Sequence, residues 1–97
     1  VRVLPITDRA HDYAQEIVDR LRDAGIRAES DYRSEKLGYK IREAQMQKIP
    51  YMLVVGDRDM ENQTVSVRTR AGVDLGAMSV DDFRTKCRAE IDTKVRD

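Results

Sequence analysis

The five residues Tyr51-Met52-Leu53-Val54-Val55 decide the fold of this chain. They form a continuous apolar run, without the alternation of apolar and polar positions that a half-exposed strand has. A strand that is covered on both faces is apolar throughout. The run therefore predicts a central strand with further layers of structure on both sides of its sheet.

Four other segments read as strands, at residues 1–6, 26–31, 64–70 and 74–76. The first carries Pro5, which belongs at an irregular point or at a strand end. In residues 26–31 and 64–70, apolar and polar positions alternate, so we expect one face of each of these strands to be exposed to water. In the third, Val65 and Val67 are expected to point inward, and Ser66, Arg68 and Arg70 to the opposite side. Residues 74–76 read as a short edge strand.

Three segments read as helices, each with a start signal. They run from a cap at Thr7-Asp8 to about Ala24, from a cap at Ser34 to about Lys48, and onward from a cap at Ser79. Gly25 follows the first helix, where a left-handed cap is easiest for glycine. Gly38 lies inside the second helix and indicates the close approach of a neighbouring strand or of a ligand. Residues 56–63 read as a polar connection.

The order strand-helix-strand-helix-strand-strand-helix predicts an α/β fold with a mixed sheet. The first three strands should be parallel and the fourth antiparallel. A chain of 97 residues makes one domain, covering residues 1–97. Because it starts with Val1 and not with Met, we expect it to be a domain excised from a larger protein.

Composition excludes several classes of function. Lys plus Arg is 18 and Asp plus Glu is 18, so the domain as a whole is not basic, although a local basic patch remains possible. The longest apolar stretch has seven residues, 49–55, too few to cross a bilayer. Cys87 is the only cysteine and His11 the only histidine, which excludes a disulfide framework and a zinc site with several Cys or His ligands. We expect Cys87 to be buried and His11 to be solvated or half-buried. No phosphate-binding loop or nucleophile motif occurs.

The neutral total hides an uneven distribution of charge. Residues 33–48 carry five basic residues (Arg33, Lys36, Lys40, Arg42, Lys48) against two glutamates, and the strand 64–70 adds two arginines. Residues 57–61 are acidic. A surface of this kind is typical of a solvated helix, or of a site that holds a polyanion and reads base edges. Tyr32 and Tyr39 are candidates for stacking on bases.

The sequence resembles the C-terminal anticodon-binding domain of threonyl-tRNA synthetases, a domain type shared with the histidyl, prolyl and glycyl enzymes. The matching stretches lie in order along nearly the whole chain: 6–8, 24–27, 31–43, 50–57, 67–70 and 74–76. The block EKLGYKIR (35–42) together with VRTR (67–70) is specific for the threonyl branch. The resemblance implies a mixed five-stranded sheet with three helices, and recognition of the tRNA(Thr) anticodon, whose second and third bases are G and U.

Six positions match residues of that family that contact RNA: Arg68, Arg42, Asp59, Lys48, Lys36 and Ser34. Arg68 matches the strand arginine that reads an anticodon base, Arg42 a helix arginine at the loop, and Lys36 a lysine near the loop backbone. The other three depart from the pattern. Asp59 stands where the family often has glutamate, Lys48 where some members have arginine, and Ser34 where some have asparagine. Lys48 keeps the charge but not the bidentate fork of arginine.

The resemblance implies that the parent protein is a threonine–tRNA ligase and that this part of it is not catalytic. The parent is expected to use ATP, Mg²⁺ and a zinc ion in its catalytic domain, to be a homodimer and to be cytoplasmic. For these 97 residues we expect no catalytic residue, no metal and no cofactor. We expect a monomer that binds the tRNA(Thr) anticodon stem-loop and no membrane.

Two alternatives remain open. One is a paralogous domain of the same fold that serves another tRNA, uncharged-tRNA sensing or a protein–protein contact. The other is a small α/β enzyme or nucleotide binder that uses the ends of the parallel strands, although the chain lacks the phosphate loop and the nucleophile–base pair that this would need.

Overall fold

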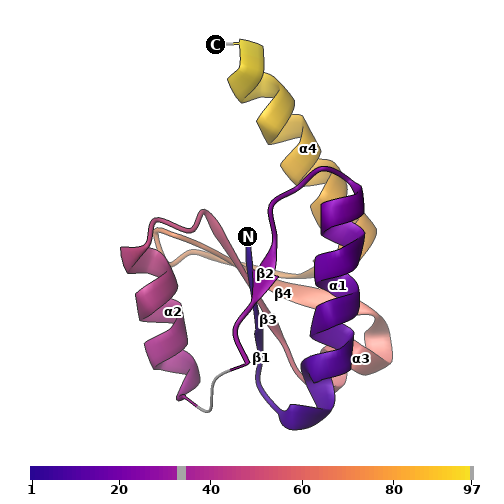
Figure 1. Cartoon of the computed structure of the whole chain (residues 1–97), viewed down its shortest axis with the longest axis vertical. Coiled ribbons are helices and arrows are strands. Elements are labelled where there is room, and N and C mark those ends of the chain that lie inside the picture. Colours follow the sequence, from indigo (N-terminus) through magenta and orange to yellow (C-terminus); the bar gives the residue numbers. More distant parts are fainter. Residues whose placement is uncertain (33–34, 97) are drawn as a thin grey trace.

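A five-stranded mixed sheet runs through the middle of the molecule and carries helices on both faces (Figure 1). The computed structural model describes residues 1–32 and 35–96, and side chains as far as residue 90. The strands are β1 (Arg2–Pro5), β2 (Glu29–Ser30), β3 (Tyr51–Val55), β4 (Thr64–Thr69) and β5 (Asp74–Ser79). The helices are the 3₁₀ helix η1 (Asp8–Ala10), α1 (His11–Asp23), α2 (Leu37–Met46), α3 (Asp57–Asn62) and α4 (Val80–Arg96).

The strand order is β2-β1-β3-β4-β5. Strand β1 is parallel to β2 and β3, whereas β4 is antiparallel to β3 and β5 is antiparallel to β4. The predicted α/β fold with a mixed five-stranded sheet is therefore confirmed, including the direction of the first four strands. Strand β2 is shorter than predicted, because only Glu29 and Ser30 pair with β1. Strand β5 is longer and continues to Ser79.

The apolar run predicted as the central strand is β3, and it is buried on both faces. On one face Leu53 and Val55 belong to the larger core, which they share with Phe83 of α4 and with α1. On the other face Met52 and Val54 belong to a smaller core under α2. Helix α2 thus lies on one face of the sheet, while α1 and α4 cover the other (Figure 1).

Two helix ends follow the sequence signals closely. Gly25 ends α1 in a left-handed conformation (φ +79°), and the Ile26 N–H donates to the Leu21 carbonyl (3.0 Å). This hydrogen bond is the mark of a Schellman cap. At the start of α4 the Ser79 Oγ accepts a hydrogen bond from the Asp82 N–H (3.0 Å), so the predicted serine cap is confirmed.

Two other helix starts differ from the expectation. Thr7 lies at the cap position of η1 but makes no capping hydrogen bond, and its buried Oγ1 has no partner among the described residues. The prediction that its side chain caps the helix is therefore wrong, and the chain enters α1 through a 3₁₀ turn. The predicted cap Ser34 lies outside the described residues. Lys36 occupies the cap position of α2.

Two further predictions are corrected. The polar connection contains the short helix α3. Its six residues carry no apolar stripe, so hydrophobic periodicity gave no sign of it. The expected crowding of Gly38 by a strand is also wrong, because a Cβ built there meets no described atom within 4 Å. The space beside this glycine is open.

Candidate nucleic-acid interface

Arg68 lies on the face of the sheet that carries α2. It is paired with Met52 across β3 and β4, and directly opposed residues of neighbouring strands point to the same face. Met52 is fully buried under α2, whereas Arg68 is half-exposed. Val65 and Val67 point to the other face and are fully buried, as predicted. Arg68 therefore lies on β4, the neighbour of the strand β3 that α2 covers.

One side of α2 faces the strands β4 and β5. A Cβ built at Gly72, in the turn between these strands, lies 3.8 Å from the Gln45 Nε2. Arg42 precedes Gln45 by three residues and Gly38 precedes Arg42 by four, and residues with these spacings share one side of a helix. Arg42 is exposed. The exposed Arg42 and the half-exposed Arg68 therefore lie on two elements, α2 and β4, that border the same face of the sheet. We call the surface made by Gly38, Arg42, Gln45 and Arg68 the α2–β4 surface.

Lys48 lies at the end of α2 in a left-handed conformation (φ 62°) that side chains other than glycine rarely adopt. It follows the last turn of the helix, where the Ile49 N–H donates to the Ala44 carbonyl (3.0 Å). The carbonyl of Pro50, two residues after Lys48, accepts a hydrogen bond from the Arg70 N–H (3.1 Å). Lys48 and Arg70 are both exposed, so the end of α2 and the end of β4 present basic side chains together.

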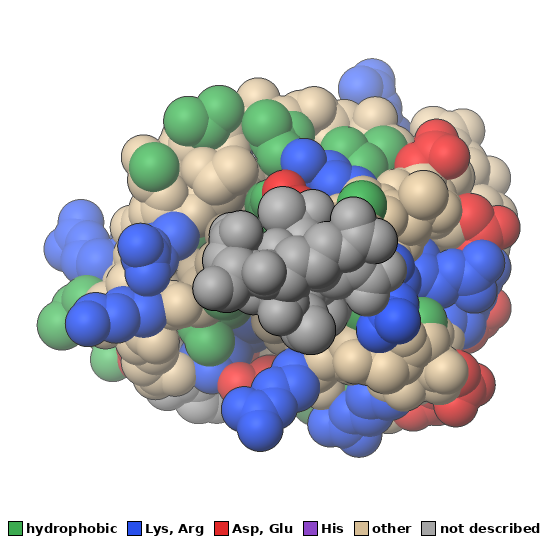
Figure 2. Space-filling model, turned by 90° about the horizontal axis from the view of Figure 1, so that it is seen from above, with side chains coloured by type: hydrophobic (Ala, Val, Ile, Leu, Met, Phe, Trp, Pro, Cys, Tyr) green, Lys and Arg blue, Asp and Glu red, His purple; other side chains and the backbone are tan. Residues whose placement is uncertain are grey.

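Lys36 is exposed at the opposite end of α2, at its N-terminal cap position. No acidic residue lies in the first turn of that helix. Figure 2 shows Lys and Arg side chains on the side of the molecule where α2 lies, with few acidic side chains among them. Most of the acidic side chains visible in that view lie on the opposite side. The predicted local basic patch is therefore present.

Lys40 does not belong to that patch, although the sequence counted it among the basic residues of the helix. It is only 4% exposed, and its Nζ donates to the Asp31 carbonyl (3.2 Å). Lys40 lies four residues before the buried Ala44, on the side of the helix that faces β2. This spacing was the available signal, and it indicates that the ammonium joins α2 to the chain after β2.

Asp59, the third residue of α3, is 8% exposed. Its Oδ2 accepts a hydrogen bond from the Gly56 N–H (3.1 Å). Its Oδ1 accepts hydrogen bonds from the hydroxyls of Thr64 (3.0 Å) and Ser66 (3.5 Å). The carboxylate thus joins the start of α3 to the first half of β4. Its contact with a base stays a prediction.

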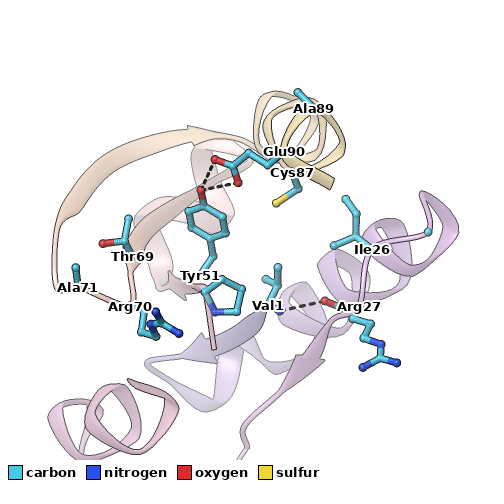
Figure 3. Close-up of a pocket in the computed structure, with 12 residues that line it drawn as sticks. Val1, Ile26, Arg27, Tyr51, Thr69, Arg70, Ala71, Cys87, Ala89 and Glu90 are labelled. Atoms are coloured by element: carbon cyan, nitrogen blue, oxygen red, sulfur yellow. Dashed lines mark hydrogen bonds between the residues drawn. The ribbon is translucent and has the colours of Figure 1, made fainter. Parts of the chain in front are cut away.

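A mainly apolar cleft of about 840 Å³ lies where β1 and β3 begin, between α4 and the turn that follows β4 (Figure 3). Of the residues predicted to contact RNA, the five that the structure describes (Arg68, Arg42, Asp59, Lys48 and Lys36) lie outside its lining. Within it, the Tyr51 hydroxyl contacts both carboxylate oxygens of Glu90 (2.6 and 2.7 Å). Burial and this hydrogen bond raise the pKa of Tyr51 above its ordinary value.

Cys87 also lines this cleft and is buried, as predicted. Burial raises the pKa of its thiol to about 11, so the sulfur stays protonated at neutral pH. His11 is half-exposed and lies beside Tyr32, with ring centroids 4.8 Å apart. Among the residues that the structure describes, no group of three or more His, Cys, Asp or Glu side chains is arranged to hold a metal ion. No helix in the same residues has the length and apolar character needed to cross a membrane.

Comparison with known families matches residues 1–90 to a model described as an anticodon binding domain. A threonine–tRNA ligase from Syntrophomonas wolfei is 59% identical over 95 residues, and one from Desulforamulus reducens is 60% identical over 94. These matches cover 98% and 97% of this chain. The chain spans only 15% of the length of either relative.

Solved structures agree with the fold. The RNA-binding domain of threonyl-tRNA synthetase from Cryptosporidium parvum is similar with a TM-score of 0.84 and 27% identity, over 91% of this chain and 22% of that one. A histidyl-tRNA synthetase from a Nostoc species has a TM-score of 0.83 at 17% identity, over 93% of this chain and 22% of that one. The second likeness concerns the fold alone.

Proposed function

This chain belongs to the family of anticodon-binding domains, and from that premise we propose that it binds the anticodon stem-loop of tRNA(Thr) as part of a threonine–tRNA ligase. The resemblance seen in the sequence to the anticodon-binding domains of threonyl-tRNA synthetases is confirmed by the family model and by the relatives at 59% and 60% identity. The domain binds RNA in this proposal and takes no chemical part in charging it.

The observation that carries the proposal is the common position of Arg42 and Arg68 on the α2–β4 surface. A guanidinium presents paired N–H donors that match the two acceptors of a guanine edge. Single-stranded loops expose such edges because their bases unstack. The backbone of Arg68 is held in place because it is part of strand β4. Arg68 is therefore the residue that we propose to read a base. Arg42 contributes a second guanidinium from helix α2.

Three of the other predicted residues, Lys36, Lys48 and Ser34, act on the backbone of the loop in this proposal. Lys36 and Lys48 lie at the two ends of α2, so they bracket the α2–β4 surface with positive charge. A lysine is a compact point charge that suits phosphate better than a base edge. Ser34 is proposed to add a contact beside Lys36, from a position outside the described residues.

The role of the whole protein is a wider proposal, because the chain spans 15% of the length of its relatives. We propose that the parent attaches threonine to tRNA with ATP in the cytoplasm, that its metal ions belong to its other domains, and that it is a homodimer. The domain alone is proposed to be a monomer, which sedimentation would test.

The proposal is tested by titrating the domain with a fluorescently labelled threonine-anticodon stem-loop and with loops changed at the middle or third base. Each titration is made at two salt concentrations, because phosphate contacts weaken steeply with salt and base contacts do not. A preference for the cognate loop that persists at higher salt is the expected result. Equal affinity for all loops would contradict it and favour a paralogous domain with another partner.

A further inference from the structure

Asp59 has little to offer an RNA base, because it is largely buried and its two carboxylate oxygens already accept three hydrogen bonds from this chain. The donors are the Gly56 N–H and the hydroxyls of Thr64 and Ser66, and the side chain is 8% exposed. A base that took one of these oxygens would leave a donor of the protein without its partner. An unpaired buried donor is unfavourable, because it has lost its water without gaining another partner.

Two of these three hydrogen bonds come from the strand that carries Arg68. Thr64, Ser66 and Arg68 alternate along β4, so they lie on one face of the strand. The register between β4 and β5 shifts between Val67 and Arg68. The extra residue is Leu75 of β5, so the pairing of Arg68 with β5 is displaced, whereas its pairing with Met52 of β3 continues in register. Arg68 thus has regular pairing on one side only, and the part of β4 before the shift leads the strand to it.

Besides its backbone pairing with β3 and β5, the part of β4 before the shift is held by side chains at two points. On the α2 face, Asp59 accepts from Thr64 and Ser66. From the other side of the sheet, the Tyr13 hydroxyl of α1 donates to the Thr64 carbonyl (2.7 Å). Burial and the nearby negative charge of Asp59 raise the pKa of Tyr13 to about 12, which keeps this hydroxyl protonated as a donor. Asp59 therefore supplies one of two anchors that set the path of the strand toward Arg68.

We propose that Asp59 is a positioning residue for Arg68 and not a reader of bases: its carboxylate fixes the start of β4, and the strand then presents the arginine to the RNA. This proposal rests on the proposed function, because it assumes that Arg68 contacts RNA. It assigns to Asp59 a task different from the base contact that the family resemblance implies for the longer glutamate.

The test is a double-mutant cycle in the 97-residue chain, with Asp59→Ala, Arg68→Ala and the combination of both. The readout is the ratio of affinities for the cognate stem-loop and for loops with one changed base, at a temperature where circular dichroism shows every variant folded. We expect Asp59→Ala to lower that ratio at least about threefold in the wild-type background and not to change it when Arg68 is already alanine. Equal losses in both backgrounds would mean that Asp59 reads a base itself and would overturn the proposal.

Thr64→Val is the milder companion variant, since it keeps the carboxylate and removes one of its donors. A positioning role predicts that Thr64→Val lowers the same discrimination as Asp59→Ala, only less. A base-reading carboxylate predicts the opposite, because losing a competing donor would free it for RNA. Asp59→Ala with unchanged discrimination in a folded protein would also overturn the proposal, since Asp59 would then serve stability alone.

A failure of the proposed function is recognised separately, as a wild-type domain that binds all stem-loops alike. The positioning claim is then judged without RNA, by the NMR resonances of the Arg68 backbone amide and side-chain Nε–H. Asp59→Ala and Thr64→Val should shift both resonances if β4 carries the effect. Resonances of Arg68 that match the wild type in both variants would overturn the claim.

Discussion

Arg68 lies directly opposite Met52 across β3 and β4, so a half-exposed arginine and a fully buried methionine lie side by side on the same face of the sheet. Met52 is under α2, and Arg68 is the next position outward. Helix α2 therefore lies beside the Arg68 side chain and leaves it partly exposed. Five predictions follow from this arrangement and from its surroundings.

Arg68→Ala should weaken binding of the cognate stem-loop by about 1–3 kcal/mol and reduce discrimination at one base. A bidentate pair between the guanidinium and a base edge is lost, whereas loops already changed at that base lose little. Isothermal titration calorimetry with the cognate stem-loop and with loops changed at one base measures both the binding free energy and the discrimination. Arg70→Ala is the matched control, because it removes the same charge two residues further along the chain. It should weaken all loops alike, and equal behaviour of the two variants would contradict base reading by Arg68.

Lys36→Ala should weaken all loops equally and reduce the slope of log affinity against log salt by about 0.7, the value of one phosphate contact on a single strand. Salt titrations of the wild type and the variant measure this change. Lys86→Ala on α4 is the control on the opposite face of the sheet and should leave the slope unchanged. A Lys36→Ala variant that alters base preference would show that the division between phosphate contacts and base contacts is wrong.

Lys48→Gly should raise the free energy of unfolding by about 0.5–1 kcal/mol while weakening RNA binding. Glycine accepts the left-handed conformation at this position without the steric cost that a Cβ brings. Lys48→Ala removes the same charge but keeps the Cβ, so it should weaken RNA binding equally without the gain in stability. Urea melts measure the free energy of unfolding of the two variants and so separate the loss of charge from the change in backbone strain. Equal stability of Lys48→Gly and Lys48→Ala would contradict the view that the left-handed conformation at Lys48 is strained.

Lys40→Ala should lower the free energy of unfolding by about 1–3 kcal/mol, because the Asp31 carbonyl loses a buried hydrogen bond. The salt dependence of RNA binding should remain that of the wild type, since the ammonium is not at the surface. Urea melts and salt titrations measure the two properties on the same sample. A stable variant with a smaller salt slope would show that Lys40 belongs to the basic patch after all.

Stability should decrease above pH 9 because of the buried thiol of Cys87. The ordinary pKa of a thiol is 9.0, and burial raises the pKa of Cys87 to about 11 in the folded state. Between these values the folded state keeps a proton that the unfolded state has lost. The contribution is therefore complete below pH 9 and is lost as the pH rises toward 11, by up to about 1.4 kcal/mol per pH unit. Urea melts from pH 8 to 10 measure the start of the decline, below the ordinary pKa of 10.0 above which Tyr13 and Tyr51, whose pKa values are also raised, lower stability in the same way. A Cys87→Ala variant with the same decline in this range would contradict this origin.

The parts of the fold that the sequence predicts are those where one pattern dominates. The apolar run of β3, the alternation of β4 and the glycine after α1 each have a single structural meaning, and the structure agrees with all three. Helix α3 was not predicted, because five polar residues and the single apolar Met60 show no hydrophobic periodicity. The only local sign was the spacing of Gly56 and Asp59, in which a carboxylate reaches back to the N–H at the helix start.

The candidate site was predictable in its residue types but not in its geometry. Charge counting treated Lys36, Lys40 and Arg42 alike, although tertiary packing buries one of them and leaves two exposed. The role of Asp59 depends on Thr64 and Ser66, which become its neighbours only when β4 folds back beside α3. Contacts of this kind depend on the fold and not on spacing along the chain.

The most direct test of the central claim is to map the surface that binds RNA by NMR, using the ¹⁵N-labelled domain and the cognate stem-loop. We expect amide shifts on the α2–β4 surface, at Gly38, Arg42, Gln45 and Arg68. Shifts confined to the apolar cleft of Figure 3, at Tyr51, Cys87 and Ala89, would contradict it.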